Sequence, residues 1–113
     1  RLKSRPQFLF GRRGTTERRR SLVLQARRRK ASTVIGAGFT ATKKIGNAVI
    51  RNRAKRRLRE AARQLLPLHG EVGTDYVFIA RMETATIGWQ RLLDDMEAAL
   101  VWLAPKLNGS KAR

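Results

Sequence analysis

Two stretches of alternating apolar and polar residues predict strands in the first half of the chain. In the stretch from Ser21 to Arg27, one side is apolar and consists of Leu22, Leu24 and Ala26. In the stretch from Thr33 to Thr42, one side consists of Ile35, Ala37, Phe39 and Ala41. The other side of the second stretch is small and partly polar, and its glycines would let another backbone approach closely. We therefore expect a sheet with one buried face and one open face.

Apolar residues at helical spacing predict two long helices. The first should run from about Ala48 to Leu66, with Asn47 as its cap and the turn of residues 67–70 as its end. Its apolar side consists of Ile50, Ala54, Leu58, Ala61 and Leu65. The second should begin near Gly88, and its apolar side consists of Trp89, Leu92, Leu93, Met96, Leu100 and Leu103. Both apolar sides should pack against the buried face of the sheet.

Three further segments complete the predicted fold. Residues 75–81 are apolar on both alternating faces, which predicts an interior strand. Residues 4–10 combine a Ser cap, an early Pro and a short apolar set, which predicts a brief helix ending at Gly11. Residues 106–113 lack a packing signal. We expect one mixed α and β domain over residues 1–105 and a flexible basic tail over residues 106–113.

The charge of the chain is strongly positive and unevenly distributed. The 113 residues include 26 Lys and Arg against 8 Asp and Glu, a formal net charge of +18. Residues 1–63 carry 21 of the basic side chains and 2 of the acidic ones. One half of the domain is therefore a cationic surface, which attracts polyphosphates at long range.

The densest cationic run lies on the first long helix, where five of the seven residues from Arg51 to Arg57 are basic. A solvated surface is the ordinary interpretation of a short basic run. Here the only acidic residue at helical spacing is Glu60, which faces Arg56 and Arg63, so repulsion within the helix stays largely uncompensated. Phosphate groups would supply the missing negative charge, and arginine binds them with two parallel hydrogen bonds.

Several classes of function are disfavoured. The chain has no cysteine, no apolar run near the ~20 residues of a membrane span and no signal-peptide pattern, so we expect a soluble, cytoplasmic protein without membrane contact. His69 lies in a predicted turn without a second ligand, and Asp94 and Asp95 point apart on a predicted exposed helix face, so neither predicts a catalytic or metal site. Because no helix-turn-helix, zinc-ligand set or zipper is present, single-stranded or irregular RNA is favoured over DNA.

The segment TKKIGNAVIRNRAKRRLRE, residues 42–60, resembles the signature of the protein subunit of bacterial ribonuclease P. The order of the other predicted segments agrees with that family over nearly the whole chain except the tail. The resemblance implies an α+β fold, an α/β sandwich like the second domain of ribosomal protein S5, with a left-handed βαβ crossover that includes the signature helix. It also implies an accessory subunit of the endoribonuclease that exposes the mature 5′ end of tRNA. The catalyst would be the ribonuclease P RNA, and Mg²⁺ would be bound chiefly by that RNA.

The resemblance implies two groups of binding residues and no catalytic or metal-binding residue in the protein. The single-stranded 5′ leader of precursor tRNA would lie between the first helix and the sheet, against Phe8, Gln25, Thr40, Lys44 and Arg51. Gln25 stands where some members have an aromatic residue, so we expect a hydrogen bond there instead of stacking. Phe10 is a second aromatic candidate for this group, with a core role as the alternative. The catalytic RNA would contact Lys43, Asn52, Arg53, Lys55, Arg56 and Arg59, with Lys43 shared between the groups.

Some assignments keep an alternative. Asn52 would either contact RNA or make a hydrogen bond within its helix. Trp89 is expected in the core, whereas Trp102 lies off the apolar side and would cover an edge or meet a partner. Arg18 to Arg20 and Arg27 to Arg29 are general cationic surface or local RNA contacts. Two other functions compete with the family resemblance: a structural RNA-binding protein, and a protein-only nuclease, which would need clustered carboxylates or paired histidines.

Overall fold

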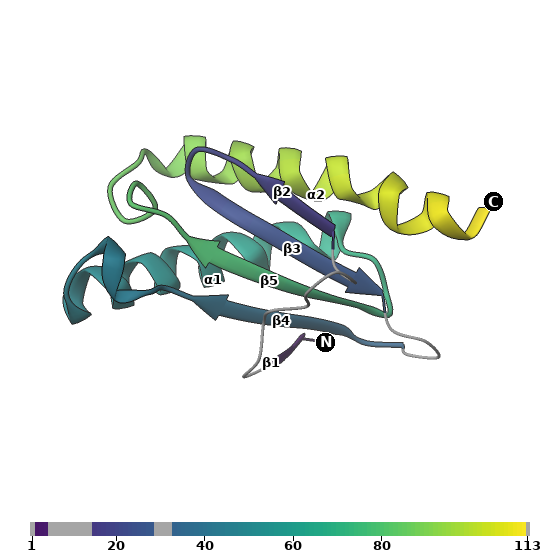
Figure 1. The fold of residues 1–113 in the computed structure, drawn as a ribbon, viewed down its shortest axis with the longest axis horizontal. Coiled ribbons are helices and arrows are strands. Elements are labelled where there is room, and N and C mark those ends of the chain that lie inside the picture. Colours follow the sequence, from purple (N-terminus) through teal and green to yellow (C-terminus); the bar gives the residue numbers. More distant parts are fainter. Residues whose placement is uncertain (1, 5–14, 29–32, 113) are drawn as a thin grey trace.

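The computed structural model describes residues 2–4, 15–28 and 33–112. In chain order the elements are β1 (Leu2–Ser4), β2 (Thr15–Arg18), β3 (Leu22–Arg28), β4 (Ile35–Thr40), the short 3-10 helix η2 (Lys43–Ile45), α1 (Ala48–His69), β5 (Thr74–Ala80) and α2 (Trp89–Ala112). Figure 1 shows one sheet with the two long helices behind it. Apart from Ser4, which ends β1, the residues of the predicted helix 4–10 lie outside the described residues.

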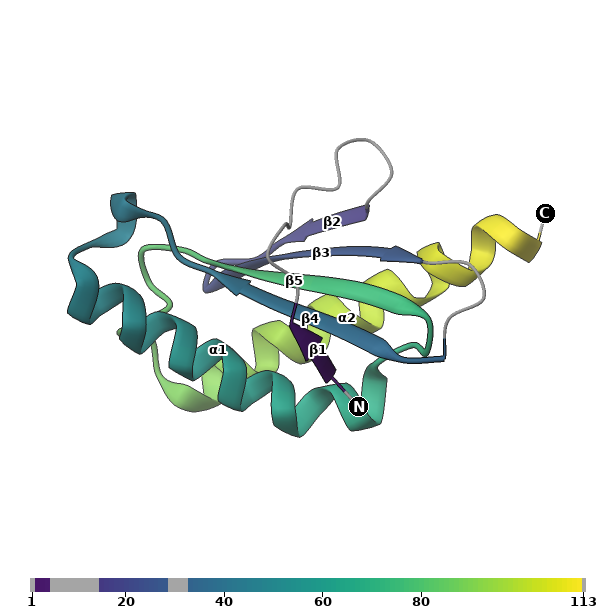
Figure 2. The same ribbon diagram turned by 90° about the horizontal axis from the view of Figure 1, so that it is seen from below.

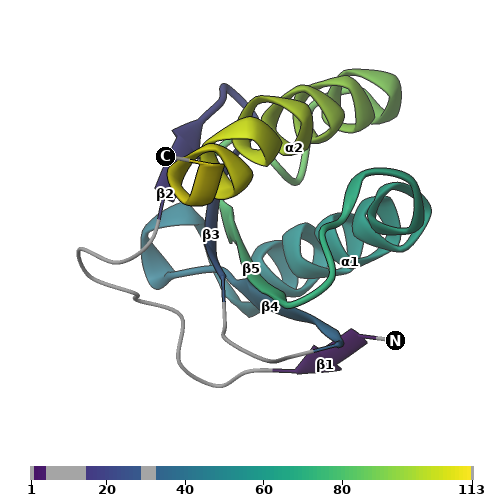
Figure 3. The ribbon, with the colours of Figure 1, turned by 90° about the vertical axis from the view of Figure 1, so that its right-hand side faces the viewer.

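The five strands form one mixed sheet in the order β1-β4-β5-β3-β2. β5 lies in the centre, parallel to β4 and antiparallel to β3, as its two apolar faces predict. Both α1 and α2 lie on the same side of the sheet (Figures 2 and 3). No helix of the described residues covers the opposite side, which we call the helix-free face.

The connection from β4 through α1 to β5 is left-handed. In Figure 1 β4 and β5 both run towards the left, α1 lies behind the sheet, and β5 lies above β4. Viewed along the direction from β4 to β5, with the chain moving away from the viewer, the path turns anticlockwise. This hand is opposite to that of nearly all such crossovers. The α+β sandwich with a left-handed crossover is therefore confirmed.

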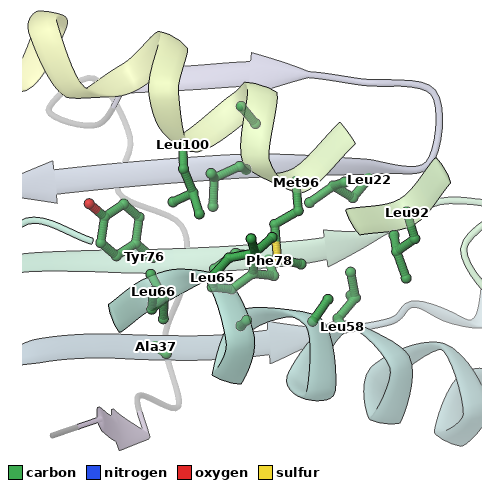
Figure 4. Packing of buried hydrophobic residues seen from close by; sticks show 14 of the residues in the cluster. Leu22, Ala37, Leu58, Leu65, Leu66, Tyr76, Phe78, Leu92, Met96 and Leu100 are labelled. Atoms are coloured by element: carbon green, nitrogen blue, oxygen red, sulfur yellow. The ribbon is translucent and has the colours of Figure 1, made fainter. Parts of the chain in front are cut away.

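The core lies between the sheet and the two helices (Figure 4). β3 contributes Leu22, Leu24 and Ala26, each with no exposed surface, so the alternation along this strand predicts its buried side correctly. In the middle of the core, Phe78 of β5 is fully buried and its ring stacks on Phe39 of β4, with the ring centres 5.2 Å apart. The fully buried residues from the helices include Ala54, Leu58, Ala61, Leu92, Met96 and Leu103.

Helix α1 begins as predicted and ends later. Asn47 is its cap, and the expected stop before Pro67 is wrong because the helix continues to His69. The proline removes only one backbone donor, and the buried Leu65 and Leu66 hold this turn against the core. The backbone N–H of Gly70 then donates to the carbonyl oxygen of Leu66 at 2.7 Å, which closes the helix.

Helix α2 extends past residue 106, where the flexible tail was expected to begin. α2 continues through Pro105 and Lys106 to Ala112. Leu107 is only 5% exposed because it lies one turn beyond Leu103 and extends the buried stripe of the helix.

Two polar residues have partners that sequence spacing does not predict. The Nε2 atom of His69 lies 2.9 Å from Oε2 of Glu97 on α2. Asp95, expected on an exposed face, is buried and accepts hydrogen bonds from the hydroxyl group of Ser21 at 2.8 Å and from its backbone N–H at 3.3 Å. Both contacts join segments that are far apart in the chain, so a local pattern cannot show them.

Candidate nucleic-acid interface

The strand register defines three rows of residues on the helix-free face. Because Leu22, Leu24 and Ala26 point into the core, the residues between them point to the opposite side. One row consists of Arg18, Val23, Ile79 and Thr40, from β2 across to β4. The next consists of Thr16, Gln25, Val77 and Gly38, and the third contains Arg27, Asp75 and Gly36.

On β4 and β5, burial changes sharply between the first two rows. Val77 has no exposed surface and Gly38 is buried, whereas Ile79 and Thr40 are partly exposed. The accessible end of the face is therefore the end where β4 and β5 finish, at the left of Figure 1. α1 begins at this same end.

Two predicted leader-binding residues, Gln25 and Thr40, share the helix-free face. They lie in neighbouring rows and two strands apart, which places them about 12 Å from each other. The side-chain oxygen Oε1 of Gln25 is buried and has no hydrogen-bond partner within the described part of the chain. A buried polar atom without a partner is costly, so this oxygen needs a donor that the described residues do not supply.

The other two described residues of that group, Lys44 and Arg51, lie just beyond the end of β4. Lys44 is exposed on η2. Arg51 is half-buried on the sheet-facing side of α1, one turn before the buried Ala54, and its Nε atom is buried without a hydrogen-bond partner in the described structure. Arg51 thus carries an unsatisfied donor in the first turn of α1, close to the end of β4.

Gly46 and Asn47 set the position of η2 relative to α1. Gly46 has φ 147°, a conformation that other residues rarely adopt, and a Cβ atom here would lie 2.9 Å from Cβ of Ile50. The Oδ1 atom of Asn47 accepts a hydrogen bond from the backbone N–H of Ile50 at 3.0 Å. These two residues of the signature therefore act through the backbone.

Asn52, Arg56 and Arg59 form an outer stripe along α1, at spacings of four and three residues. All three are exposed, and Asn52 makes no hydrogen bond through its side chain in the described structure, which leaves the alternative of an internal hydrogen bond unsupported. Glu60 pairs with Arg63 at 2.7 Å, so Arg56 has no carboxylate partner among the described residues. The stripe therefore presents uncompensated positive charge to solvent.

The remaining predicted contacts to the catalytic RNA lie outside this stripe. Lys43 is exposed on η2, Lys55 is half-buried on the flank of α1 near Arg51, and Arg53 is exposed on the opposite flank. At the end of the stripe, the guanidinium carbon of Arg59 lies 5.6 Å from the ring centre of Phe39, which holds this side chain near the edge of β4. The structure thus distributes the predicted residues around α1.

Arg57 belongs to the same basic run but serves the fold. Its two terminal nitrogens donate to the carbonyl oxygens of Thr84 and Ile87 at 2.7 and 2.6 Å, and its guanidinium lies 5.7 Å from the ring centre of Trp89. Burial, followed by the positive charge of Arg53, lowers the pKa of Arg57 from its ordinary value. Sequence spacing does not show this role, because the partners are backbone atoms about 30 residues away.

The aromatic candidates lie either away from the proposed interface or outside the described residues. Phe8 and Phe10 lie outside the described residues. Trp89 is partly buried against the core, as expected, whereas Trp102 is 39% exposed with Nζ of Lys106 4.0 Å from its ring centre. Within residues 2–4, 15–28 and 33–112, no group of three or more His, Cys, Asp or Glu side chains is placed to hold a metal ion, and no helix is long and apolar enough to cross a membrane.

Sequence comparisons identify related proteins over most of the chain. The sequence model of the family described as Ribonuclease P matches residues 1–103. The ribonuclease P protein component of Caulobacter vibrioides is 53% identical over 109 residues, which cover 96% of this chain and 73% of that protein. The corresponding protein of Ruegeria pomeroyi is 50% identical over 109 residues, which cover 93% of this chain and 87% of that protein.

Solved structures show the same fold. The RNase P protein of Staphylococcus aureus matches with a TM-score of 0.67 and 26% identity, covering 80% of this chain and 82% of that chain. The RNase P protein of Thermotoga maritima matches with a TM-score of 0.66 over 77% of this chain and 81% of that chain. At 23% identity, the second match concerns the fold alone.

Proposed function

Because this chain belongs to the ribonuclease P protein family, the protein subunits of the nuclease that matures the 5′ end of tRNA, we propose that it binds two RNAs on different surfaces. The accessible end of the helix-free face, with η2 and Arg51, binds the single-stranded 5′ leader of precursor tRNA. The outer stripe of α1, with Arg53, Lys55 and Lys43, binds the catalytic RNA. Phe8 would complete the leader site.

One observation carries the leader site: two of its residues hold buried polar atoms without protein partners. Oε1 of Gln25 is an acceptor and Nε of Arg51 is a donor, and neither is satisfied by the described part of the chain. A single RNA strand offers both kinds of partner, since riboses and bases carry donors and phosphates carry acceptors.

The catalytic-RNA surface is supported by charge. α1 carries seven Arg and Lys but only one Glu, and that Glu pairs with Arg63. Exposed arginines without carboxylate partners bind phosphates strongly through two parallel hydrogen bonds. We propose that the Mg²⁺ ions of the holoenzyme are bound chiefly by its RNA, while the protein positions the substrate and neutralises phosphate charge.

The central test is cleavage of precursor tRNA by a ribonuclease P RNA at sub-optimal Mg²⁺. Adding the chain should lower the Mg²⁺ concentration that half-maximal cleavage requires, because protein cations replace part of the counterion charge. A purely structural RNA-binding protein would leave that concentration unchanged. RNA-free protein that cleaved the substrate would instead indicate a protein-only nuclease.

The leader site has its own test in the assembled holoenzyme. Arg51→Ala should weaken binding of precursor tRNA about tenfold while leaving mature tRNA nearly unaffected, because only the precursor carries a leader. Arg91→Ala removes an equal charge from the exposed side of α2 and is the matched control. Equal losses for precursor and mature tRNA would reject the assignment of Arg51.

A further inference from the structure

We propose that Arg18 of β2 is a second phosphate contact for the same RNA strand, at the far edge of the helix-free face from Arg51. The inference rests on the proposed leader site and extends it across the whole sheet. The strand would cross β4, β5, β3 and β2 and would meet a cation at each end of its path. Arg18 would therefore bind leader nucleotides farther along the strand than those beside Thr40.

The register places Arg18 and Thr40 in one row. Arg18 pairs with Val23, Val23 with Ile79, and Ile79 with Thr40, so the four residues lie on the same face. In this row Arg18 is exposed, Ile79 and Thr40 are partly exposed and Val23 is 8% exposed, whereas Val77 in the next row is fully buried. A strand that lay across the sheet would therefore follow the row that ends at Arg18.

Pairing distinguishes Arg18 from the two arginines that follow it. Nε of Arg19 lies 3.0 Å from Oε2 of Glu17, and Nε of Arg20 lies 2.9 Å from Oε1 of Glu83. Arg18 is exposed and has no carboxylate partner among the described residues. Of the three consecutive arginines, only Arg18 keeps its guanidinium available and lies on the helix-free face.

The dimensions suit a short single strand. Three strand spacings separate β2 from β4, a distance of about 14 Å. About four stacked nucleotides span that distance at ~3.4 Å each, and fewer are needed if the strand is extended. A leader of only one or two nucleotides beyond Thr40 would therefore not reach Arg18.

Leader length provides the experiment. Holoenzyme with Arg18→Ala would be compared with wild type for binding of precursor tRNA with a leader of about two nucleotides and of about ten. The variant should lose about two- to fivefold in affinity for the long leader and nothing for the short one. For the variant, the slope of log affinity against log salt concentration should be shallower than that of wild type by about 0.7. This is the value for one phosphate contact on a single strand.

Arg20→Ala is the matched control because it removes an equal charge from the same hairpin but from a paired arginine. If Arg20→Ala and Arg18→Ala lose affinity equally, or Arg18→Ala weakens both leaders alike, general charge explains the loss and the proposal is wrong. If Arg18→Ala binds the long leader as tightly as wild type does, and wild type still prefers the long leader, the role of Arg18 is wrong but the leader site is unaffected. If wild type does not distinguish precursor from mature tRNA, the leader site itself fails, and Arg18 with it.

Discussion

Asn47 caps α1 by accepting, at Oδ1, a 3.0 Å hydrogen bond from the backbone N–H of Ile50. This bond fixes the first turn of the helix directly after the Gly46 bend. Lys44 lies before the bend and Arg51 lies one turn after it, so the cap sets the spacing between two proposed leader contacts. The cap residue thus sets the geometry of the proposed site through the helix backbone.

Removal of the cap should lower stability. Asn47→Ala leaves the Ile50 N–H without its side-chain acceptor and should reduce the free energy of unfolding by about 1 kcal/mol, measured by urea denaturation. Asn47→Asp retains an acceptor and adds a negative charge at the helix N-terminus, so it should unfold like wild type or later. An alanine variant as stable as the aspartate variant would contradict the cap.

Alanine variants of Arg57 and Arg53 should have different effects, the first on protein stability and the second on RNA binding. Arg57→Ala leaves the carbonyl oxygens of Thr84 and Ile87 without their donors and should lower the free energy of unfolding by about 1–3 kcal/mol. Arg53→Ala should not destabilise the protein, because it removes a positive charge near Arg57, but should weaken binding to the catalytic RNA. Thermal unfolding and an RNA titration of both variants check this division, which a stable Arg57→Ala protein would refute.

Arg56 and Arg63 test the importance of pairing on the outer side of α1. Arg56 has no carboxylate partner in the described structure, whereas Arg63 donates to Glu60 at 2.7 Å. Arg56→Ala should weaken catalytic-RNA binding more than Arg63→Ala and should reduce the salt dependence by about one phosphate contact. Binding isotherms at several salt concentrations measure both quantities, and equal effects would show that total charge alone matters.

The C-terminal part of α2 should contribute to folding. Leu107 is 5% exposed, so Leu107→Ala should lower the free energy of unfolding by about 2 kcal/mol. Val101 lies on the same helix but is 52% exposed, so Val101→Ala should change stability by less than about 0.5 kcal/mol. Equal stability of the two variants in urea would restore the interpretation of this segment as an unpacked tail.

Periodicity in the sequence predicts the parts of this fold that bury apolar side chains. It correctly identifies β3, β4, β5 and both long helices, together with the cap at Asn47. β2 has the sequence TTER and lacks apolar alternation because an edge strand is held mainly by its backbone bonds to β3. The hand of the crossover depends on how distant segments pack, so only the family resemblance predicted it.

The candidate site was predictable as a set of charges but not as a set of pairs. Glu60 has two arginines at helical spacing, and only the structure shows that Arg63 is its partner. Likewise, the carboxylates that engage Arg20 and Ser21 lie more than 60 residues away in the chain. Arg18 lies on the helix-free face because it belongs to β2, a strand that the sequence pattern does not predict.

The 100° turn between successive helical residues has a consequence for the two RNAs that we place against α1. Arg51 directs its charge to the sheet side and Arg56 directs its charge outwards, although only five positions separate them. The backbones of substrate and ribozyme would then be kept apart by a rod about 10 Å thick, comparable to the Debye length of ~8 Å at physiological salt. In this arrangement α1 would act as a cationic spacer that weakens the mutual repulsion of two polyanions without letting them touch.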